Sequence, residues 1–339
     1  MKAAVFYGKE DLRIEDLTIP TPGADEVVLR VRACGICGTD MHIFDGDEGA
    51  APTPSGTVLG HEFAGEVVAV GANVKQIKVG DRACVDPNKL CNECDFCREG
   101  VGHFCEHMIG IGTTVHGGFA EYCCVPQSQV YCFSDAISYE QAAMTEPVAC
   151  CLHGMDMCDI AQGDTVAVIG GGMIGLLMLQ LAKLKGAAKL IMVEPIEAKR
   201  EHAKALGADI VIDPFTEDVP EALKKYGVGR INTVIECVGK PATIEQAIAI
   251  AGNKSTVMMF GLTKPNDTIS VKPFEIFKKE IVLKASFINP YTQKRALALI
   301  DSGRIDVSSM VLERASVEEL PAILADKKRR AAGKILITF

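Results

Sequence analysis

Four cysteines lie close together in a segment that is otherwise polar and rich in turn-forming residues. They are Cys91, Cys94, Cys97 and Cys105, with the spacing C-x2-C-x2-C-x7-C. Short gaps let successive thiolates reach one centre, and four thiolates complete the closed tetrahedral shell of a structural zinc ion. An iron–sulfur cluster also uses four cysteines, but the bacterial ferredoxin run ends with a three-residue gap rather than seven. The spacing therefore predicts a structural zinc site.

A glycine motif of the form G-x-G-x-x-G follows where an apolar run passes into a helical pattern. It consists of Gly170, Gly172 and Gly175, with Met173 and Ile174 between the last two. The first glycine permits a tight turn, the second removes a side chain that would block a pyrophosphate, and the third lets helix and strand approach. The helix N-terminus then offers free N–H groups to phosphates. The motif predicts a dinucleotide site.

An acid at the end of the next strand bears on which dinucleotide binds. The carboxylate of Glu194 can accept hydrogen bonds from both ribose hydroxyls of NAD, and it repels the 2′-phosphate of NADP. The alternative is an exposed Glu with no ligand. Lys199 and Arg200 follow closely and could weaken the discrimination, or could be solvated helix residues. NAD is the predicted cofactor, with Glu194 and Lys199 in its site.

A second group of residues could hold a metal ion with a different ligand set. Its members are Cys37, Thr39, Asp40, His42, His61, Glu62 and Glu146. Each has an ordinary reading alone: a small core cysteine, a hydrogen-bonded histidine, a loop turn or a helix cap. Beside a zinc motif and a nucleotide motif, these ordinary readings are disfavoured for the group as a whole.

The elements that position these residues change character along the chain. Residues 1–145 alternate short β-rich runs with Gly and Pro turns, which is typical of a mainly β domain. From about residue 164, apolar strands alternate with helical patterns, and six buried strands predict a doubly wound parallel sheet. The expected strands are 2–7, 12–17, 27–32, 63–70, 119–125, 165–169, 190–193, 209–212, 233–238, 256–260, 281–285 and 334–339, and the expected helices are 173–185, 197–206, 243–251 and 294–300.

Composition narrows the class of protein. The chain has 339 residues, 48% of them hydrophobic and 23% charged, which suits about two globular domains. A net charge of −9 disfavours nucleic acid and anionic membranes as partners. Neither a membrane span nor a signal peptide is expected. Fourteen cysteines without an export signal favour the reducing cytoplasm and argue against disulfides.

Taken together, these motifs resemble the zinc-dependent medium-chain dehydrogenase/reductase superfamily over essentially the whole chain. The markers are Cys37-Gly-Thr-Asp40, Gly60-His61-Glu62-x2-Gly65, the four-cysteine segment and Gly170–Gly175. The resemblance implies a GroES-like β-barrel catalytic domain in residues 1–148, an inserted NAD-binding Rossmann domain in 149–287, and a return to the catalytic domain in 288–339. It also implies that active site and cofactor meet in the cleft between the domains.

The resemblance assigns roles to the second group of residues. Cys37, His61 and Glu146 would hold a catalytic zinc ion, and Glu62 would be a further ligand or an acid that exchanges with zinc-bound water. With the four-cysteine site, this makes two zinc ions per chain. Glu146 followed by Pro resembles the polyol (sorbitol/xylitol), butanediol and threonine dehydrogenase branch. Cys34, Cys150 and Cys151 are read as buried apolar residues instead of ligands.

Three more residues would move the proton and orient the site. By resemblance, the hydroxyl of Thr39 hydrogen-bonds the substrate oxygen, His42 relays the proton to solvent, and Asp40 orients the imidazole of His61. The implied reaction moves a hydride between a secondary hydroxyl of a polyol or diol and NAD, giving a ketose. Family members also pair their last nucleotide-domain strands, so a homodimer or homotetramer is expected.

Alternatives remain within and outside the enzyme class. Cys37-Gly-Thr-Asp-Met-His-Ile-Phe44 is similar to the active-site segment of L-threonine 3-dehydrogenases, and 2,3-butanediol is another substrate for this branch. Against threonine, Val148-Ala-Cys-Cys-Leu-His153 departs from the Leu-Gly-Asn-Ala typical of those enzymes. A non-catalytic NAD-binding regulator on the same scaffold would be expected to lack a ligand or relay residue, and none is missing. A phosphorylated polyol stays open.

Overall fold

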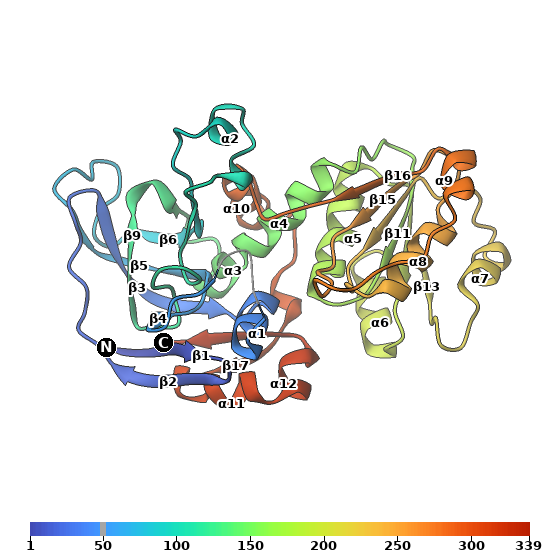
Figure 1. The fold of residues 1–339 in the computed structure, drawn as a ribbon. Coiled ribbons are helices and arrows are strands. Elements are labelled where there is room, and N and C mark those ends of the chain that lie inside the picture. The colour runs from blue at the N-terminus through green and yellow to red at the C-terminus, as the bar shows by residue number, and fades with distance from the viewer. Residues whose placement is uncertain (48–51) are drawn as a thin grey trace. The chain divides into compact units, whose positions relative to one another are not determined.

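The computed structural model describes residues 1–47 and 52–339, which divide into two units. The first unit joins Met1–Ala149 to Asn289–Phe339, and the second is Cys150–Ile288. Both termini lie in the first unit (Figure 1). Helix α4 (Thr145–Asp156) carries the chain out of the first unit. No helix in the described part of the chain is long and apolar enough to cross a membrane.

A long central strand organises the first unit. Strand β3 (Glu26–Gly35) pairs antiparallel with β5 (Glu62–Val70), β9 (Tyr122–Pro126) and β18 (Lys334–Thr338). Along β3, Leu29 and Val31 are fully buried while Arg30 between them is exposed, as the two-residue period of a strand requires. The full order of this sheet is β10-β6-β5-β3-β18-β17, with β9 also on β3. A second sheet runs β2-β1-β4, and β7 pairs with β8.

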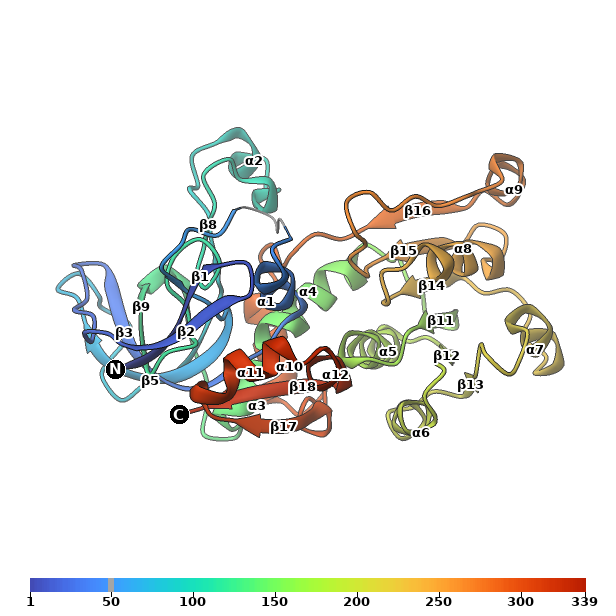
Figure 2. The same cartoon turned by 60° about the horizontal axis from the view of Figure 1, so that its bottom comes forward.

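The remaining elements of the first unit include a small lobe with short helices and a return segment. In Figure 2, α11 and α12 of the return segment lie beside β17 and β18. The remaining bounds are β1 (Lys2–Gly8), β2 (Asp11–Asp16), α1 (Gly38–Asp45), β4 (Thr57–Val58), β6 (Arg82–Val85), β7 (Asn88–Lys89), α2 (Asp95–Arg98), β8 (Ile109–Gly110), β10 (Val130–Cys132), α3 (Tyr139–Ala143), α10 (Gln293–Asp301), β17 (Val311–Ala315), α11 (Leu320–Ala325) and α12 (Lys327–Ala332), with 3-10 turns at Gly102–Phe104, Gln127–Gln129, Ser308–Met310 and Val317–Glu319.

The register of β3 brings distant segments together at its carboxyl end. Gly35 pairs with Glu62 at the start of β5 and with Leu336 in β18. Helix α1 begins three residues after Gly35. As a result, the segments around residues 35–45, 61–62 and 334–336 meet at one edge of the sheet, although the first and last are separated by nearly the whole chain.

The second unit is the predicted doubly wound parallel sheet. Its order is β13-β12-β11-β14-β15-β16, so the chain starts in the middle, runs to one edge, and then crosses to the other side (Figure 1). Every neighbouring pair is parallel. Its elements are β11 (Thr165–Ile169), α5 (Met173–Lys185), β12 (Lys189–Val193), α6 (Glu197–Ala205), β13 (Ile210–Ile212), α7 (Val219–Lys225), β14 (Thr233–Glu236), α8 (Pro241–Ile250), β15 (Thr256–Met259), α9 (Pro273–Lys279) and β16 (Val282–Ala285).

Two expectations about strands need correction. The strand expected at 281–285 is not buried: β16 is the edge of the sheet, and Val282 and Leu283 are 48% and 36% exposed. The strand expected at 119–125 begins at Tyr122, because Phe119 uses its backbone to bond Leu59 and Ala4 instead. The other expected strands and helices appear within a few residues of their predicted bounds.

Candidate active site and cofactor site

Helix α1 owes its start to a capping arrangement between Cys37 and Asp40. Cys37 is the extended N-cap residue, and its backbone N–H donates to Asp40 Oδ2 at 2.8 Å. This bond satisfies one of the donors that a helix start leaves free. It also fixes the direction of the Cys37 side chain, whose Sγ lies 3.8 Å from Thr39 Oγ1. The residues that cap α1 are therefore the same residues that set the geometry of the site at Cys37.

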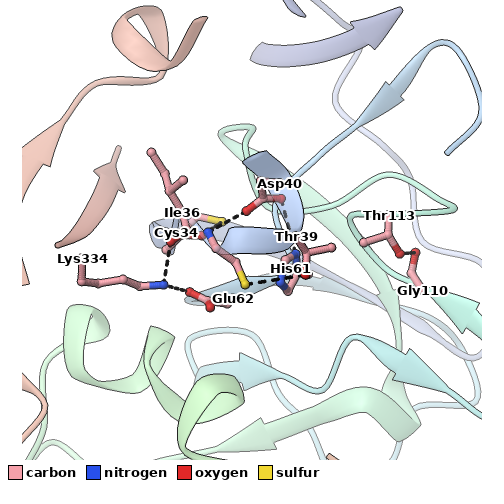
Figure 3. Close-up of polar contacts among 11 residues, drawn as sticks. Cys34, Ile36, Thr39, Asp40, His61, Glu62, Gly110, Thr113 and Lys334 are labelled. Carbon is pink, nitrogen blue, oxygen red and sulfur yellow. Dashed lines mark hydrogen bonds and ion pairs between the residues drawn. The ribbon is translucent and has the colours of Figure 1, made fainter. Parts of the chain in front are cut away.

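His61 reaches the same place through a glycine turn. Gly60 has φ +94°, and a Cβ there would lie 2.7–2.8 Å from Phe119 and from the sulfur of Cys34. Only glycine fits both the backbone angle and the space. The turn sets His61 Nδ1 3.4 Å from Asp40 Oδ1, with both side chains buried (Figure 3). Asp40 therefore contacts the imidazole and also caps α1, while its role in orienting His61 stays a prediction of the family resemblance.

The electrostatics of His61 favour a bound cation. Burial opposes a charge on the ring, but the charges of Asp40 and Cys37 outweigh burial and raise the pKa of His61 well above its ordinary value. A metal ion would replace the proton that this pKa favours on the ring, since a ligating imidazole must be neutral.

Three potential ligands converge in the described part of the chain. The sulfur of Cys37, a ring nitrogen of His61 and a carboxylate oxygen of Glu62 all lie within 4.8 Å of one another. Buried polar atoms beside this point lack a hydrogen-bond partner: Asp40 Oδ1, His61 Nδ1 and Glu62 Oε1. Sulfur, imidazole and carboxylate are all common zinc ligands. The donor set and its unsatisfied atoms fit a zinc ion.

Glu146 and His42, which the resemblance assigned to this site, are not among the residues whose ligand atoms converge. Glu146 is buried in the first turn of α4. His42 lies on α1 and is about one-third exposed, with its Nδ1 3.1 Å from Asp47 Oδ2. Of the cysteines read as apolar, Cys34 and Cys151 are fully buried, whereas Cys150 is only half-buried, which corrects that expectation.

Sequence reasoning missed Lys334, the first residue of β18. Lys334 is 3% exposed, pairs with Glu62 Oε2 and donates to the carbonyl oxygen of Ile36 at 2.9 Å (Figure 3). Gly35 makes room for this contact, because a Cβ there would lie 2.2 Å from Glu62 Oε2. A single lysine opening the otherwise apolar run Lys-Ile-Leu-Ile was the only available signal.

The four cysteines of the lobe also converge. Their sulfur atoms lie within 4.8 Å of one another, and Cys91 Sγ is 3.9 Å from Cys97 Sγ. Backbone N–H groups of Glu93 and Cys94 donate to Cys91 Sγ and lower the pKa of the Cys91 thiol to about 6. None of the described cysteines forms a disulfide. Four thiols around one point, one already stabilised as thiolate, fit a tetrahedral zinc ion.

The glycine turn before α5 leaves space for a ligand. Gly170 has φ +99°, and a Cβ on Gly175 would lie 1.7 Å from the carbonyl oxygen of Gly170, so the turn demands glycine at both. A Cβ on Gly172 would meet nothing within 4 Å. Gly172 is the N-cap of α5 and carries no capping side chain, so the helix start is open to phosphates. Met173 and Ile174 form the first turn of that helix.

Glu194 is held by the backbone at the end of β12. Its Oε2 accepts from Gly171 N–H at 2.6 Å and its Oε1 from Ile196 N–H at 2.9 Å. The residue is 5% exposed, which rules out the solvated strand-end reading. Arg200 donates to the carbonyl oxygens of Glu194 and Pro195, so its guanidinium stabilises the local turn.

The two cations near Glu194, Arg200 and Lys199, have different environments. Arg200 also pairs with Asp213 at 3.2 Å, which neutralises it further. Lys199 is half-buried in the first turns of α6. Of these two cations, Lys199 is therefore the one whose charged group contributes less to holding the local fold.

Comparison with known proteins decides the family. The Alcohol dehydrogenase GroES-like domain model matches residues 23–135, and the Zinc-binding dehydrogenase model matches residues 173–302. Sorbitol dehydrogenase of Bacillus subtilis (strain 168) is 33% identical over 94% of this chain and 91% of its own. The chain belongs to the zinc-dependent medium-chain dehydrogenase/reductase superfamily. It is an oxidoreductase of the polyol-like branch, as the motifs predicted.

Other relatives show the range of this branch. An L-threonine 3-dehydrogenase of Caldanaerobacter subterraneus subsp. tengcongensis is 37% identical over 80% of this chain and 79% of its own. A Sinorhizobium meliloti 1021 protein solved bound to NADP has 37% identity and a TM-score of 0.96, covering 100% of this chain and 99% of its own. An Escherichia coli CFT073 alcohol dehydrogenase complexed with NADH has 28% identity and a TM-score of 0.91, with coverage of 100% and 99%.

Proposed function

We propose that this zinc-dependent dehydrogenase oxidises a secondary hydroxyl of a polyol or vicinal diol with NAD as the acceptor. The secondary alcohol and NAD⁺ are converted to a ketone, NADH and a proton, and a sugar alcohol would give a ketose. The observation that carries the proposal is the buried convergence of Cys37, His61 and Glu62, with unsatisfied polar atoms beside it. A zinc ion bound there would act as a Lewis acid that makes a hydroxyl easier to deprotonate.

The protein's own residues would hold the substrate and move its proton. Thr39 follows the Cys37 cap, and its Oγ1, which lies beside the sulfur of Cys37, would accept a hydrogen bond from the substrate hydroxyl. As Thr39 takes up the substrate proton it would release its own hydroxyl proton, which His42, on the same helix and partly exposed, would pass to solvent. Asp40 would keep His61 in one orientation. Glu146 is proposed as a further ligand at this site, on the strength of the family resemblance.

We further propose two zinc ions per chain, one at Cys37 and one at the four cysteines. The second ion would be structural, because four thiolates leave it no free position. Glu194 favours NAD. Its buried carboxylate accepts hydrogen bonds from the N–H groups of Gly171 and Ile196, and the guanidinium of Arg200 is paired with Asp213 and does not offset the charge that repels a 2′-phosphate. The NADP-bound relative makes this preference a point to test directly.

A rival substrate is L-threonine, because a threonine dehydrogenase is 37% identical to this chain. The segment Val148-Ala-Cys-Cys-Leu-His153 favours the polyol reading over it. The deciding experiment measures NADH formation by zinc-loaded enzyme with a panel of polyols, 2,3-butanediol, L-threonine, sugar-alcohol phosphates and primary alcohols. The highest kcat/KM should belong to an unphosphorylated polyol or diol. A preference of about tenfold or more for threonine, a phosphate ester or a primary alcohol would overturn the proposal.

A further inference from the structure

Lys334 is a buried cation that the proposed reaction does not use. Its ammonium group lies at the start of β18, opposite the carboxylate of Glu62, and both side chains are almost wholly buried. The ammonium also donates to the Ile36 carbonyl oxygen at 2.9 Å, which fixes its position from the side of the Cys37 segment (Figure 3). A charged lysine is costly to bury without a partner, and here Glu62 supplies that partner.

The two oxygens of Glu62 have different environments. Oε2 is engaged by Lys334, whereas Oε1 is buried and has no hydrogen-bond partner. Glu62 also belongs to the cluster that contains the Cys37 sulfur and a His61 nitrogen. One carboxylate thus has two competing positive partners: the fixed ammonium on one side and the metal position on the other.

The balance of charge explains why the ammonium matters. Asp40 and Glu62 are two buried acidic side chains beside the half-buried Cys37, and Lys334 is the basic side chain that pairs with Glu62. Without Lys334, Glu62 would be a buried anion with only the metal left to neutralise it. The carboxylate would then turn to the metal and stay there.

We propose that Lys334 is a positioning residue: its ion pair with Glu62 restrains that carboxylate from becoming a permanent zinc ligand and keeps one metal position open to substrate. The inference rests on the proposed zinc-dependent function. It adds a residue from the last strand of the chain to the control of the site. Gly35 belongs to the same arrangement, because any side chain there would separate the pair.

The test compares Lys334→Met, Lys334→Arg and the double variant Lys334→Met/Glu62→Gln with wild type. Each protein is loaded with zinc, and release of its faster-exchanging zinc to a chelator is followed without substrate. Lys334→Met should release that zinc more slowly than wild type, and its kcat with the best alcohol substrate should fall on the order of 10–100-fold. Lys334→Arg, which keeps the cation, should retain wild-type release and most of the turnover.

The double variant separates positioning from a merely structural role. With Glu62→Gln the freed carboxylate is gone, so zinc release should return to the wild-type rate or faster. Thermal unfolding gives a second readout: Lys334→Met should lose more melting temperature in the zinc-free protein than in the zinc-loaded one. Lys328→Met, an exposed lysine on the neighbouring α12, is the matched control and should change none of these quantities.

Faster zinc release from Lys334→Met would overturn the inference, as would an equal loss of melting temperature with and without zinc. A Lys334→Met protein that does not fold even with zinc would also count against it, because the metal should then neutralise Glu62. These measurements need no substrate. If polyols fail as substrates while zinc release behaves as described, the substrate proposal is wrong and the role of Lys334 stands.

Discussion

Asp40 illustrates how single residues serve both the fold and the chemistry here. One of its oxygens caps helix α1 at Cys37, and the other faces His61 at 3.4 Å. The helix cap is thus observed, and the contact with His61 is compatible with the predicted orienting role. Replacing Asp40 would disturb both, so it is a poor probe of either. Thr39 is the better probe, because its hydroxyl has no capping role.

Thr39→Val removes the hydroxyl at nearly constant volume. If Thr39 accepts the substrate proton, kcat and kcat/KM should fall together, on the order of 10²-fold or more, while zinc content and NAD binding stay unchanged. Thr39→Ser keeps the oxygen and should retain much of the rate. Steady-state kinetics on the three proteins, with metal analysis as the control, decides the matter. Full turnover by Thr39→Val would remove Thr39 from the proton path.

We predict that Glu194 controls the choice of dinucleotide. Glu194→Ala should narrow the preference for NAD by raising the relative kcat/KM with NADP, because the buried negative charge that repels a 2′-phosphate is lost. The matched variant Lys199→Ala should lower the use of NADP if that ammonium assists the phosphate. Kinetics with both cofactors provide the measurement. A wild-type enzyme that already prefers NADP would show that Glu194 does not set the preference.

Site residues whose partners lie nearby in the sequence were predicted, whereas a residue whose partner lies far along the chain was missed. The zinc site was predictable from the short spacing of Cys91, Cys94 and Cys97. The dinucleotide site was predictable from the local glycine turn Gly170–Gly175. Lys334 gave no such sign, because its partner Glu62 is far away in sequence and meets it only through the register of β3, β5 and β18. Tertiary pairing of this kind carries no local pattern.

At the scale of elements, apolar runs bounded by Gly and Pro located most strands well. Strand β11 and helix α5 appear with the predicted bounds. The prediction that β16 is buried was wrong for a physical reason. A strand buried on both faces and an apolar strand at the edge of a sheet can have the same composition. The short β4, β7 and β8 were missed because two residues are too few to show a period.

Within the first unit, a partly buried carboxyl links the return segment to residues 1–149. Asp86 follows β6 and accepts hydrogen bonds from the Asn88 N–H at 3.1 Å and the Asn289 side-chain amide at 3.3 Å. Burial raises the pKa of Asp86 to about 6, against the opposing effect of these two donors. The folded protein therefore holds a proton here that the unfolded chain releases near its ordinary pKa of 3.8. Between those values the folded state binds more protons, so this group makes stability fall as pH rises.

Asp86→Asn should remove this pH-dependent cost. The variant should gain stability relative to wild type as pH rises from about 4 to about 6, by an amount on the order of 2–3 kcal/mol, and the gain should then stay constant. Urea unfolding of both proteins at about pH 4 and about pH 7 measures it. A difference between the two proteins that is the same at both pH values would mean that the carboxyl does not titrate in this window.

At the scale of the whole molecule, β16 offers a free edge. It pairs only with β15 among the described strands, and Val282 and Leu283 are exposed, as are Phe274 and Phe277 on the preceding α9. Strand β15, also expected at the subunit seam, lies inside the sheet with Val257 fully buried. Of the two strands expected at the seam, β16 is therefore the one at an edge of this described sheet, where it can pair with a second copy.

We expect a homodimer or a tetramer built from such dimers. Leu283→Lys should weaken the assembly, because it places a charge on the edge strand that would be covered, while Lys272→Ala outside the strand should not. Sedimentation velocity at micromolar concentration distinguishes the species. A wild-type monomer under these conditions would exclude pairing through β16.

We propose that the enzyme removes a hydride from a secondary carbinol carbon in a zinc-dependent reaction. The most direct measurement supplies a polyol or diol deuterated at that carbon and determines by mass spectrometry where the deuterium goes. We expect deuterium in NADH, a ketone at the same carbon, and loss of both products after removal of the faster-exchanging zinc. Deuterium retained in the organic product, or transfer that continues without zinc at Cys37, would contradict this proposal.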